Sequence, residues 1–280
     1  MKIITLVENT KNHSSNLINE HGLCLYIEKD NKRILFDTGR TGNFISNAKK
    51  LAVDIEDIDA VVISHGHSDH GGGLLSFLKA NNKAKVYMKR KASENHYFNF
   101  MLLSKNVSID KKVFDEYSNR INYIYDFTEI MNDIYIITDI ENHYLVPKGN
   151  KYLYCKEETG LFRDRFEHEL IMIIKEQDGI SIFTGCSHNG TANMIQTARN
   201  TFPSSSIKAI IGGFHLIKIP ILKCLTSPQE EIDVISKKII EEKVAKVYTG
   251  HCTGEKAYNK LRSILGDKIE YIKTGSEINI

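Results

Sequence analysis

The stretch that decides the fold spans residues 61–73 and reads VVISHGHSDHGGG. It begins with a short apolar run, and three histidines and one aspartate follow within six positions: His65, His67, Asp69 and His70. Imidazole and carboxylate groups are ligands that suit zinc, iron and manganese. Two histidines two positions apart can bind one ion, and the Asp-His pair can turn toward a second ion if the glycines at 71–73 let the chain coil sharply. The stretch therefore predicts a metal-binding loop at the end of a strand.

Three more histidines follow apolar runs and stand close to glycines. They are His188 in IFTGCSHNG (182–190), His215 in IIGGFH (210–215) and His251 in VYTGHCTG (247–254). Strand ends deliver side chains to a shared cleft, and nearby glycines let backbone or substrate come close. One such histidine alone would be structural in most proteins. Three of them, added to the 65–70 group, predict a common site.

The other histidines lie in less regular contexts. His168 is expected at a strand edge, and the sequence favours neither a site role nor a structural role for His21. The histidines expected at the surface are His13, His96 and His143.

The composition is that of an ordinary soluble protein. The chain has 280 residues, of which 41% are hydrophobic and 26% charged, and its formal net charge is +2. This mild basicity does not favour nucleic acid as a partner and is compatible with a small anionic substrate. There is no apolar run long enough to span a membrane, no secretory signal, and the five cysteines have no pattern. We therefore expect a cytoplasmic protein with reduced thiols, a small-molecule substrate and no membrane partner; a homo-oligomer is compatible with this composition.

Strand and helix patterns alternate along most of the chain. A hairpin is expected over 23–36, and strand–loop–helix units follow it; the same succession recurs after residue 170. Residues 89–165 are rich in tyrosine and phenylalanine and lack a clear period. We expect one α/β domain over residues 1–280, built from two packed sheets with helices outside and carrying an irregular insertion at about 89–165.

Together these motifs resemble the metallo-β-lactamase superfamily. The 64–70 run matches its metal signature, FDTG at 36–39 matches the preceding strand-end aspartate, and TGH at 249–251 matches the late histidine. The resemblance implies an αββα sandwich with a two-metal site. Five further segments are similar to the subgroup of dihydropterin-6-methyl-(ribofuranosyl)aminobenzene 5′-phosphate synthases: LVENT (6–10), EHGL (20–23), GCSH (185–188), GGFH (212–215) and GHCTG (250–254).

The resemblance also implies the ligands of each metal. His65 and His67 would bind the first metal, with His188 as its remaining ligand. Asp69 and His70 would bind the second, with His251 as its late ligand. Asp37 is expected to hold the histidine loop by accepting hydrogen bonds. Cys186 stands where many relatives carry a metal-bridging aspartate, so either a thiolate ligand or a merely packed side chain is expected there.

The activity implied is that of a metal-dependent hydrolase or synthase. Two divalent transition metals, with zinc as first choice and iron or manganese as alternatives, would share a hydroxide that attacks a small phosphorylated or pterin-like substrate. Asp69 would orient the hydroxide and His215 would assist as a donor. A phosphate could be held by basic residues at 89–91 or by Arg163 and Arg165, although a solvated face explains these as well. The alternative function is a non-catalytic or regulatory protein that binds a small ligand and keeps the metal site.

Overall fold

The computed structural model describes residues 1–12, 15–217 and 228–280. These residues form two compact units. Unit 1 comprises Met1–Tyr125, Tyr152–His168 and Ile272–Ile280, and unit 2 comprises Asp126–Lys151 and Glu169–Tyr271. Each unit contains a mixed seven-stranded sheet and helices, as the α/β class requires. The single domain expected over residues 1–280 stays a prediction, and His13 lies outside the described residues.

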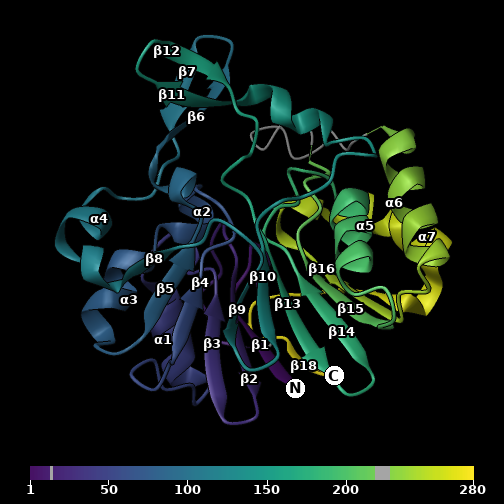
Figure 1. Ribbon diagram of the computed structural model, residues 1–280, viewed down its shortest axis with the longest axis horizontal. Helices are drawn as coiled ribbons and strands as arrows, with labels where there is room; N and C mark the ends of the chain where they lie inside the picture. The colour runs from purple at the N-terminus through teal and green to yellow at the C-terminus, as the bar shows by residue number, and fades with distance from the viewer. Residues whose placement is uncertain (13–14, 218–227) are drawn as a thin grey trace. The chain divides into compact units, whose positions relative to one another are not determined.

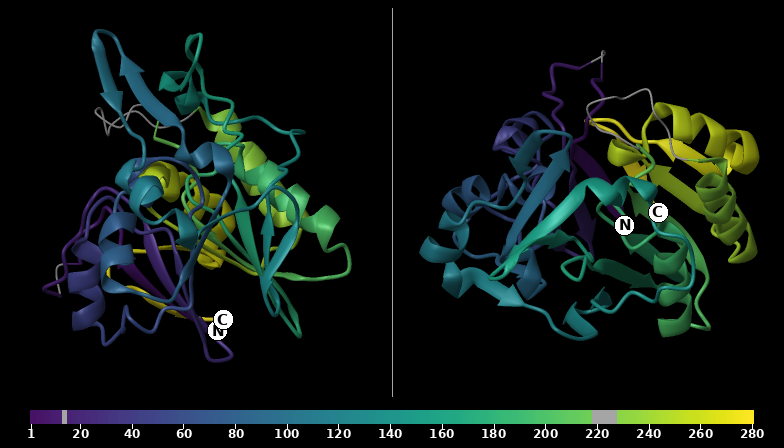
Figure 2. Two further views of the ribbon diagram at one scale, coloured as in Figure 1. Left: turned by 60° about the vertical axis from the view of Figure 1, so that its left-hand side comes forward. Right: turned by 90° about the horizontal axis from the view of Figure 1, so that it is seen from above.

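The large sheet of unit 1 has the strand order β18-β1-β2-β3-β4-β5-β8 (Figure 1). The pairs from β18 to β3 are antiparallel, and those from β3 to β8 are parallel. Its strands are β1 (Lys2–Val7), β2 (Cys24–Lys29), β3 (Lys32–Phe36), β4 (Ala60–Val62), β5 (Lys85–Met88), β8 (Ile121–Tyr123) and β18 (Glu277–Asn279). The two chain ends meet on this sheet (Figure 2), where the Met1 ammonium donates to the Ile280 carbonyl over 2.7 Å.

The helices of unit 1 are short. They are α1 (Asn43–Lys50), α2 (Ser68–Gly71), α3 (Leu74–Ala80) and α4 (Lys112–Glu116), with 3-10 turns η1 (Arg90–Ser93) and η2 (Ser118–Arg120). Helix α1 buries Phe44, Asn47 and Ala48, whose spacing places them on one face of a helix. Phe44 and Ala48 join a core cluster with Leu6 and Ile63, so apolar burial fixes this helix against the strands that precede the histidine loop.

A second, four-stranded antiparallel sheet of unit 1 occupies much of the region expected to be irregular. Its strand order is β12-β11-β6-β7, with bounds β6 (Asn95–Phe100), β7 (Leu103–Asn106), β11 (Leu153–Glu157) and β12 (Gly160–Arg163). Strand β6 buries His96 and Phe98, two residues apart, because alternate side chains of a strand share one face. His96 is 1% exposed, so its expected surface position is wrong.

The sheet of unit 2 has the order β17-β16-β15-β14-β13-β10-β9. Its strands are β9 (Thr128–Met131), β10 (Ile134–Ile137), β13 (Ile171–Glu176), β14 (Gly179–Phe183), β15 (Ile207–Gly212), β16 (Lys246–Thr249) and β17 (Ile269–Tyr271), and those from β14 to β17 are parallel. Helices α5 (Thr191–Thr201), α6 (Gln229–Glu241) and α7 (Glu255–Leu265) lie along one face of it (Figures 1 and 2). The turns η3 (Lys148–Tyr152), η4 (His251–Thr253) and η5 (Gly266–Lys268) complete the described elements. No helix in the described ranges combines the length and apolarity needed to cross a membrane.

Candidate metal centre

The histidine loop of unit 1 follows β4 and leads into α2. His65 and His70 are fully buried and His67 is 5% exposed. The ring of His65 lies 4.7 Å from that of His67 and 4.2 Å from that of His70, measured between centroids. The Asp69 carboxylate, whose side chain is 19% exposed, lies 3.2 Å from Nε2 of His21. The loop thus gathers three imidazoles and one carboxylate into a small volume.

Asp37 fixes the ring orientation of two of these histidines. Its Oδ2 accepts hydrogen bonds from Nδ1 of His70, at 2.6 Å, and from Oγ of Ser64, at 2.8 Å. Because the Ser64 hydroxyl donates to Asp37, its oxygen accepts from Nδ1 of His65, at 2.8 Å. The hydrogen-bond network therefore assigns the ring proton of both histidines to Nδ1 and leaves the lone pair on Nε2, where it can bind a metal.

His67 is held in the neutral form that a metal ligand requires. Burial lowers the pKa of its imidazole well below the usual value, and the neighbouring His168 and His96 lower it further. A neutral imidazole keeps a lone pair, so the donor set of this loop suits a divalent transition metal.

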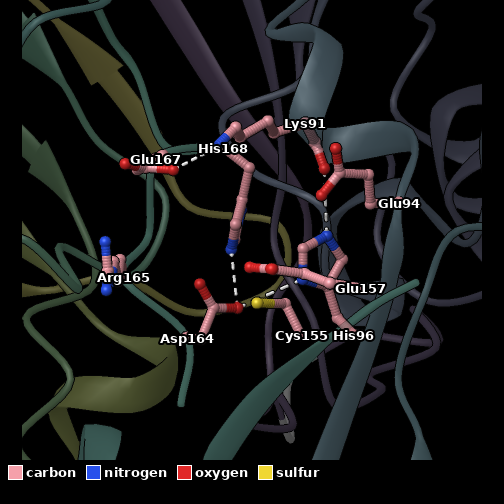
Figure 3. A pocket seen from close by; sticks show the side chains of 9 residues that line it. All are labelled: Lys91, Glu94, His96, Cys155, Glu157, Asp164, Arg165, Glu167 and His168. Carbon is pink, nitrogen blue, oxygen red and sulfur yellow. Dashed lines mark hydrogen bonds and ion pairs between the residues drawn. The ribbon is translucent and has the colours of Figure 1, made fainter. Parts of the chain in front are cut away.

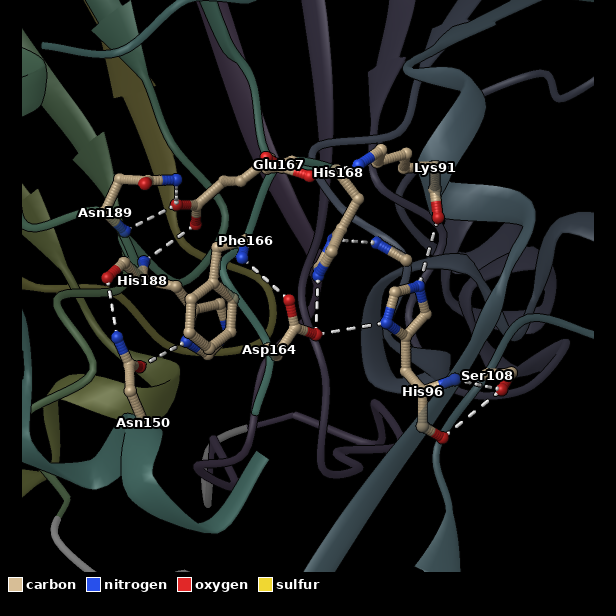
Figure 4. A network of polar contacts seen from close by, with 12 residues as sticks. Lys91, His96, Ser108, Asn150, Asp164, Phe166, Glu167, His168, His188 and Asn189 are labelled. Atoms are coloured by element: carbon tan, nitrogen blue, oxygen red, sulfur yellow. Dashed lines mark hydrogen bonds and ion pairs between the residues drawn. The ribbon is translucent and has the colours of Figure 1, made fainter. Parts of the chain in front are cut away.

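A buried network of one carboxylate and two histidines of unit 1 also supports the histidine loop. Figure 4 shows Asp164 between two rings: Oδ2 lies 3.0 Å from Nε2 of His168 and 3.1 Å from Nδ1 of His96. Nδ1 of His168 accepts from the Gly66 N–H over 3.0 Å, so its ring proton is on Nε2 and points at Asp164. His168 therefore donates to Asp164 through Nε2 and accepts from Gly66 through Nδ1, which holds Gly66 in place between His65 and His67.

The charges in this network are set by its contacts. Nε2 of His96 faces the Lys91 carbonyl at 3.2 Å, and its Nδ1 faces Asp164, so both of its ring nitrogens face acceptors. Burial opposes the charge of Asp164, but His168 and His96 outweigh it and hold the pKa of this carboxyl far below its usual range. Asp164 is consequently an anion bound between two rings.

A small cavity opens beside this network (Figure 3). Its volume is about 30 Å³, which admits a water-sized molecule but not a ring-containing substrate. Lys91 and Arg165 line it, yet four carboxylates do so as well: Glu94, Glu157, Asp164 and Glu167. Lys91 is moreover ion-paired with Glu167. The lining is acidic on balance, so the phosphate contact expected of Lys91 and Arg165 has no support from this cavity.

Unit 2 fixes His188 in the same way as unit 1 fixes His65 and His70. Nδ1 of His188 lies 3.0 Å from Oδ1 of Asn150, and the Asn150 amide donates to the His188 carbonyl over 2.8 Å (Figure 4). Since Oδ1 only accepts, the ring proton is on Nδ1 and the lone pair on Nε2. Glu169 accepts from the backbone N–H groups of His188 and Asn189, at 2.8 and 2.7 Å. Burial nevertheless raises the pKa of Glu169 to about 7.

Four more donors of unit 2 follow the parallel strands β14, β15 and β16. They are Cys186, His215, His251 and Cys252, each 8% exposed or less. The Cys252 Sγ accepts from the His215 backbone N–H over 3.2 Å and donates to the Cys186 carbonyl over 3.7 Å. Burial opposes ionisation of Cys252, but Cys186, His251 and His215 outweigh it and lower the pKa of its thiol well below the usual value.

Several of these residues were not predicted as site residues. The alternation in NHYFNF (95–100) places His96 on the buried face with Phe98, and this signal was available in the sequence. His168 was expected only at a strand edge, and it instead contacts Gly66 and Asp164. Asn150 and Asp164 carry no local signal, because their partners lie far away along the chain.

The chain is similar to known proteins of one superfamily. Residues 18–146 match a family model described as the metallo-beta-lactamase superfamily. A 7,8-dihydropterin-6-methyl-4-(beta-D-ribofuranosyl)-aminobenzene-5'-phosphate synthase from Methanocaldococcus jannaschii is 29% identical over 293 residues, covering 99% of this chain and 96% of the relative. A UPF0173 metal-dependent hydrolase from Staphylococcus carnosus is 37% identical over 62 residues, 22% of this chain and 26% of the relative.

Solved structures resemble the whole chain. The crystal structure of Tm1679, described as a metal-dependent hydrolase of the beta-lactamase superfamily, is 28% identical with a TM-score of 0.84, covering 100% of this chain and 99% of that one. Zn(2+)-bound PqqB from Methylobacterium extorquens is 10% identical with a TM-score of 0.63 over the full length of both chains. These structures show that the chain has the metallo-β-lactamase fold expected from its sequence.

Proposed function

Since the chain belongs to the metallo-β-lactamase superfamily, a group of metal-dependent hydrolases and related enzymes, we propose that it is a metal-dependent hydrolase or synthase acting on a small phosphorylated or pterin-like molecule. The observation that carries the proposal is the Asp37 network, which directs Nε2 lone pairs of His65 and His70 away from their hydrogen-bond partners. Support for the substrate class comes from the name of the Methanocaldococcus relative.

The proposed ligands divide between two divalent transition metals, zinc being the first choice. His65, His67 and His188 would hold one, and Asp69, His70 and His251 the other; this division rests on the resemblance. The donor chemistry fits: His65, His70 and His188 present Nε2, His67 is held neutral, and Asp69 supplies a carboxylate oxygen. When bound, two such ions would supply Lewis acidity and lower the pKa of a shared water.

The chain's own residues orient and hold protons around that chemistry. Asp37 keeps the ring of His70 in one orientation, and Asn150 does the same for His188. Asp69 is the carboxylate placed to accept a proton or to orient the attacking group, and Nε2 of His21, at 3.2 Å, is its neighbour. His21 would thus position the Asp69 carboxylate.

The test is turnover together with metal content. Protein stripped by a chelator and reconstituted with zinc, iron or manganese is assayed against phosphomonoesters, phosphodiesters, lactones and reduced pterins. We expect metal-dependent, saturable turnover, and we expect His67→Ala and Asp69→Ala to lose bound metal and turnover together. Glu116→Gln, at an exposed residue of α4, is the control.

Two outcomes would contradict the proposal in different ways. Wild-type protein that neither retains nor rebinds metal would overturn the metal centre itself. Full metal occupancy with saturable ligand binding but no turnover would favour the alternative of a regulatory, small-ligand-binding protein.

A further inference from the structure

The side chains of Cys186, His215 and Cys252 form a cluster within unit 2 that the proposed function does not use. We propose that these three residues bind a divalent metal that prefers thiolate ligands, namely zinc, in a separate site. The site requires no residue of unit 1. It shares no ligand with the division proposed above.

The donor atoms are close enough to bind one ion. One ligand atom from each of the three residues lies within 4.8 Å of the other two. In a tetrahedral zinc site, bonds of about 2.3 Å to sulfur and about 2.0 Å to nitrogen place neighbouring donors about 3.3–3.8 Å apart. The proposal requires that side-chain rotation closes the remaining gap.

The backbone that carries these donors is held rigidly. The three residues follow three adjacent parallel strands, β14, β15 and β16. The Ser187 hydroxyl donates to the Gly213 carbonyl over 2.7 Å, and the Thr249 hydroxyl donates to the Gly212 carbonyl over 2.8 Å. A Cβ at Gly213 would lie 2.5 Å from Sγ of Cys252, so glycine is required for this close approach.

His215 supplies the second observation that points to a ligand. It is 8% exposed, and its Nδ1 is buried without a hydrogen-bond partner among the described residues. Its Nε2 lies on the side of Gly149, where a Cβ would come within 3.0 Å of it. A buried imidazole nitrogen that lacks a partner costs free energy, which a bound ion would recover. We therefore assign His215 as a ligand here, in place of the donor role expected from the sequence.

The charge of the cluster suits a dication. Two thiolates carry two negative charges and a neutral imidazole carries none, so a bound divalent ion makes the buried complex neutral. Sulfur ligands favour zinc over magnesium, calcium and manganese. Three protein ligands leave a fourth position, which water or a further ligand would occupy.

X-ray absorption at the zinc edge tests the proposal on the unmodified protein. The ligands of the proposed function are all nitrogen and oxygen, so a zinc–sulfur shell at about 2.3 Å must come from cysteine. We expect such a shell in protein loaded with zinc to saturation. A first shell of nitrogen and oxygen alone at saturation would overturn the proposal, and so would a Cys186–Cys252 disulfide found in the purified, metal-exposed protein.

Cobalt substitution then assigns the sulfurs. The thiolate-to-cobalt charge-transfer absorption should fall to about half in Cys252→Ser, where one of two thiolates is lost, and cobalt affinity should fall in His215→Gln. Cys155→Ser is the matched control in unit 1, and Cys224→Ser controls for a thiol outside the described residues. An unchanged absorption in Cys252→Ser contradicts the site. His67→Ala should retain the absorption while it loses turnover, so the two proposals fail separately.

Discussion

Asp37 holds the ring of His70 directly and that of His65 through Ser64. We predict that Asp37→Asn lowers metal affinity about 10- to 100-fold. Asp37 accepts hydrogen bonds from Ser64 and His70 through both carboxylate oxygens, whereas asparagine has a single accepting oxygen and would turn an N–H donor toward one of these partners. Competition titration with a chromophoric chelator measures the change. Asp115→Asn, at an exposed aspartate of α4, should leave the affinity unaltered. Equal affinities for Asp37→Asn and wild type would show that Asp37 does not orient the ligands.

Glu169 makes the stability of unit 2 dependent on pH. Its pKa is raised to about 7 by burial, from the usual value of 4.5. Between these values the unfolded chain releases a proton that the folded chain keeps, so stability falls as pH rises through this window and levels off above it. Glu169→Gln removes this titration.

The difference between the unfolding free energies of wild type and Glu169→Gln should therefore change by up to about 3 kcal/mol between about pH 5 and about pH 8, with wild type losing stability at the higher pH. Urea unfolding of chelator-treated protein measures this difference, and Glu116→Gln serves as the control. A difference that stays constant with pH would mean that Glu169 is ionised throughout.

For single residues, the sequence predicted those whose type and spacing alone indicate a metal ligand. His65, His67, Asp69 and His70 are four potential metal ligands within six positions after a strand, and a metal site is the common explanation of such a run. Their supports were not predicted, since Asp164 lies 68 residues from His96 and Asn150 lies 38 residues from His188. Tertiary contacts of that kind carry no local pattern.

At the scale of elements, the glycines that follow the histidine loop let neighbouring backbone segments come close to each other. They were expected to permit a sharp coil, but Gly72 and Gly73 have ordinary helical φ values of −67° and −77°. A Cβ at Gly72 would lie 2.3 Å from the Arg40 carbonyl oxygen, and one at Gly73 would lie 2.3 Å from that of Thr38. The glycines thus let α2 and α3 pack against the backbone that follows Asp37.

We predict that Gly72→Ala lowers the free energy of unfolding by about 1–3 kcal/mol, because backbone on both sides must move. Gly42→Ala is the matched control: its φ is −78°, and its Cβ would meet only the Ser76 side chain, which can rotate. Chemical denaturation compares the two variants. A Gly72→Ala protein as stable as Gly42→Ala would contradict the close-approach explanation.

Elements with a clear period were predicted well, and those without one were not. The hairpin over 23–36 is confirmed as β2 and β3. The strands β6, β7, β11 and β12 escaped prediction because β7 and β12 are largely exposed and the pairing of β6 with β11 joins residues 55 to 61 positions apart.

At the scale of the whole molecule, the two units follow one plan. In each, antiparallel strands lead into parallel ones, and the candidate ligands stand just beyond the carboxyl ends of the parallel strands. A metal bound only by the folded chain stabilises it by mass action, by about 2.7 kcal/mol at 100 times its Kd. Removal of metal should therefore lower the melting temperature of the whole chain.

Differential scanning calorimetry with and without a chelator measures this change. We expect a clear decrease for wild type and for the control His143→Ala, whose side chain is exposed. His67→Ala and Asp69→Ala should show a smaller decrease than wild type, because each removes a ligand of one proposed metal. A wild-type melting temperature that does not respond to chelation would contradict metal-linked stability.

Anomalous diffraction at the zinc edge, from crystals of protein purified with its metal, tests the central claim most directly. The claim predicts one peak at about 2.0–2.2 Å from Nε2 of His65 and His67, and a second at that distance from Asp69 and Nε2 of His70. Well-ordered imidazoles at these positions with no peak at any transition-metal edge would contradict it.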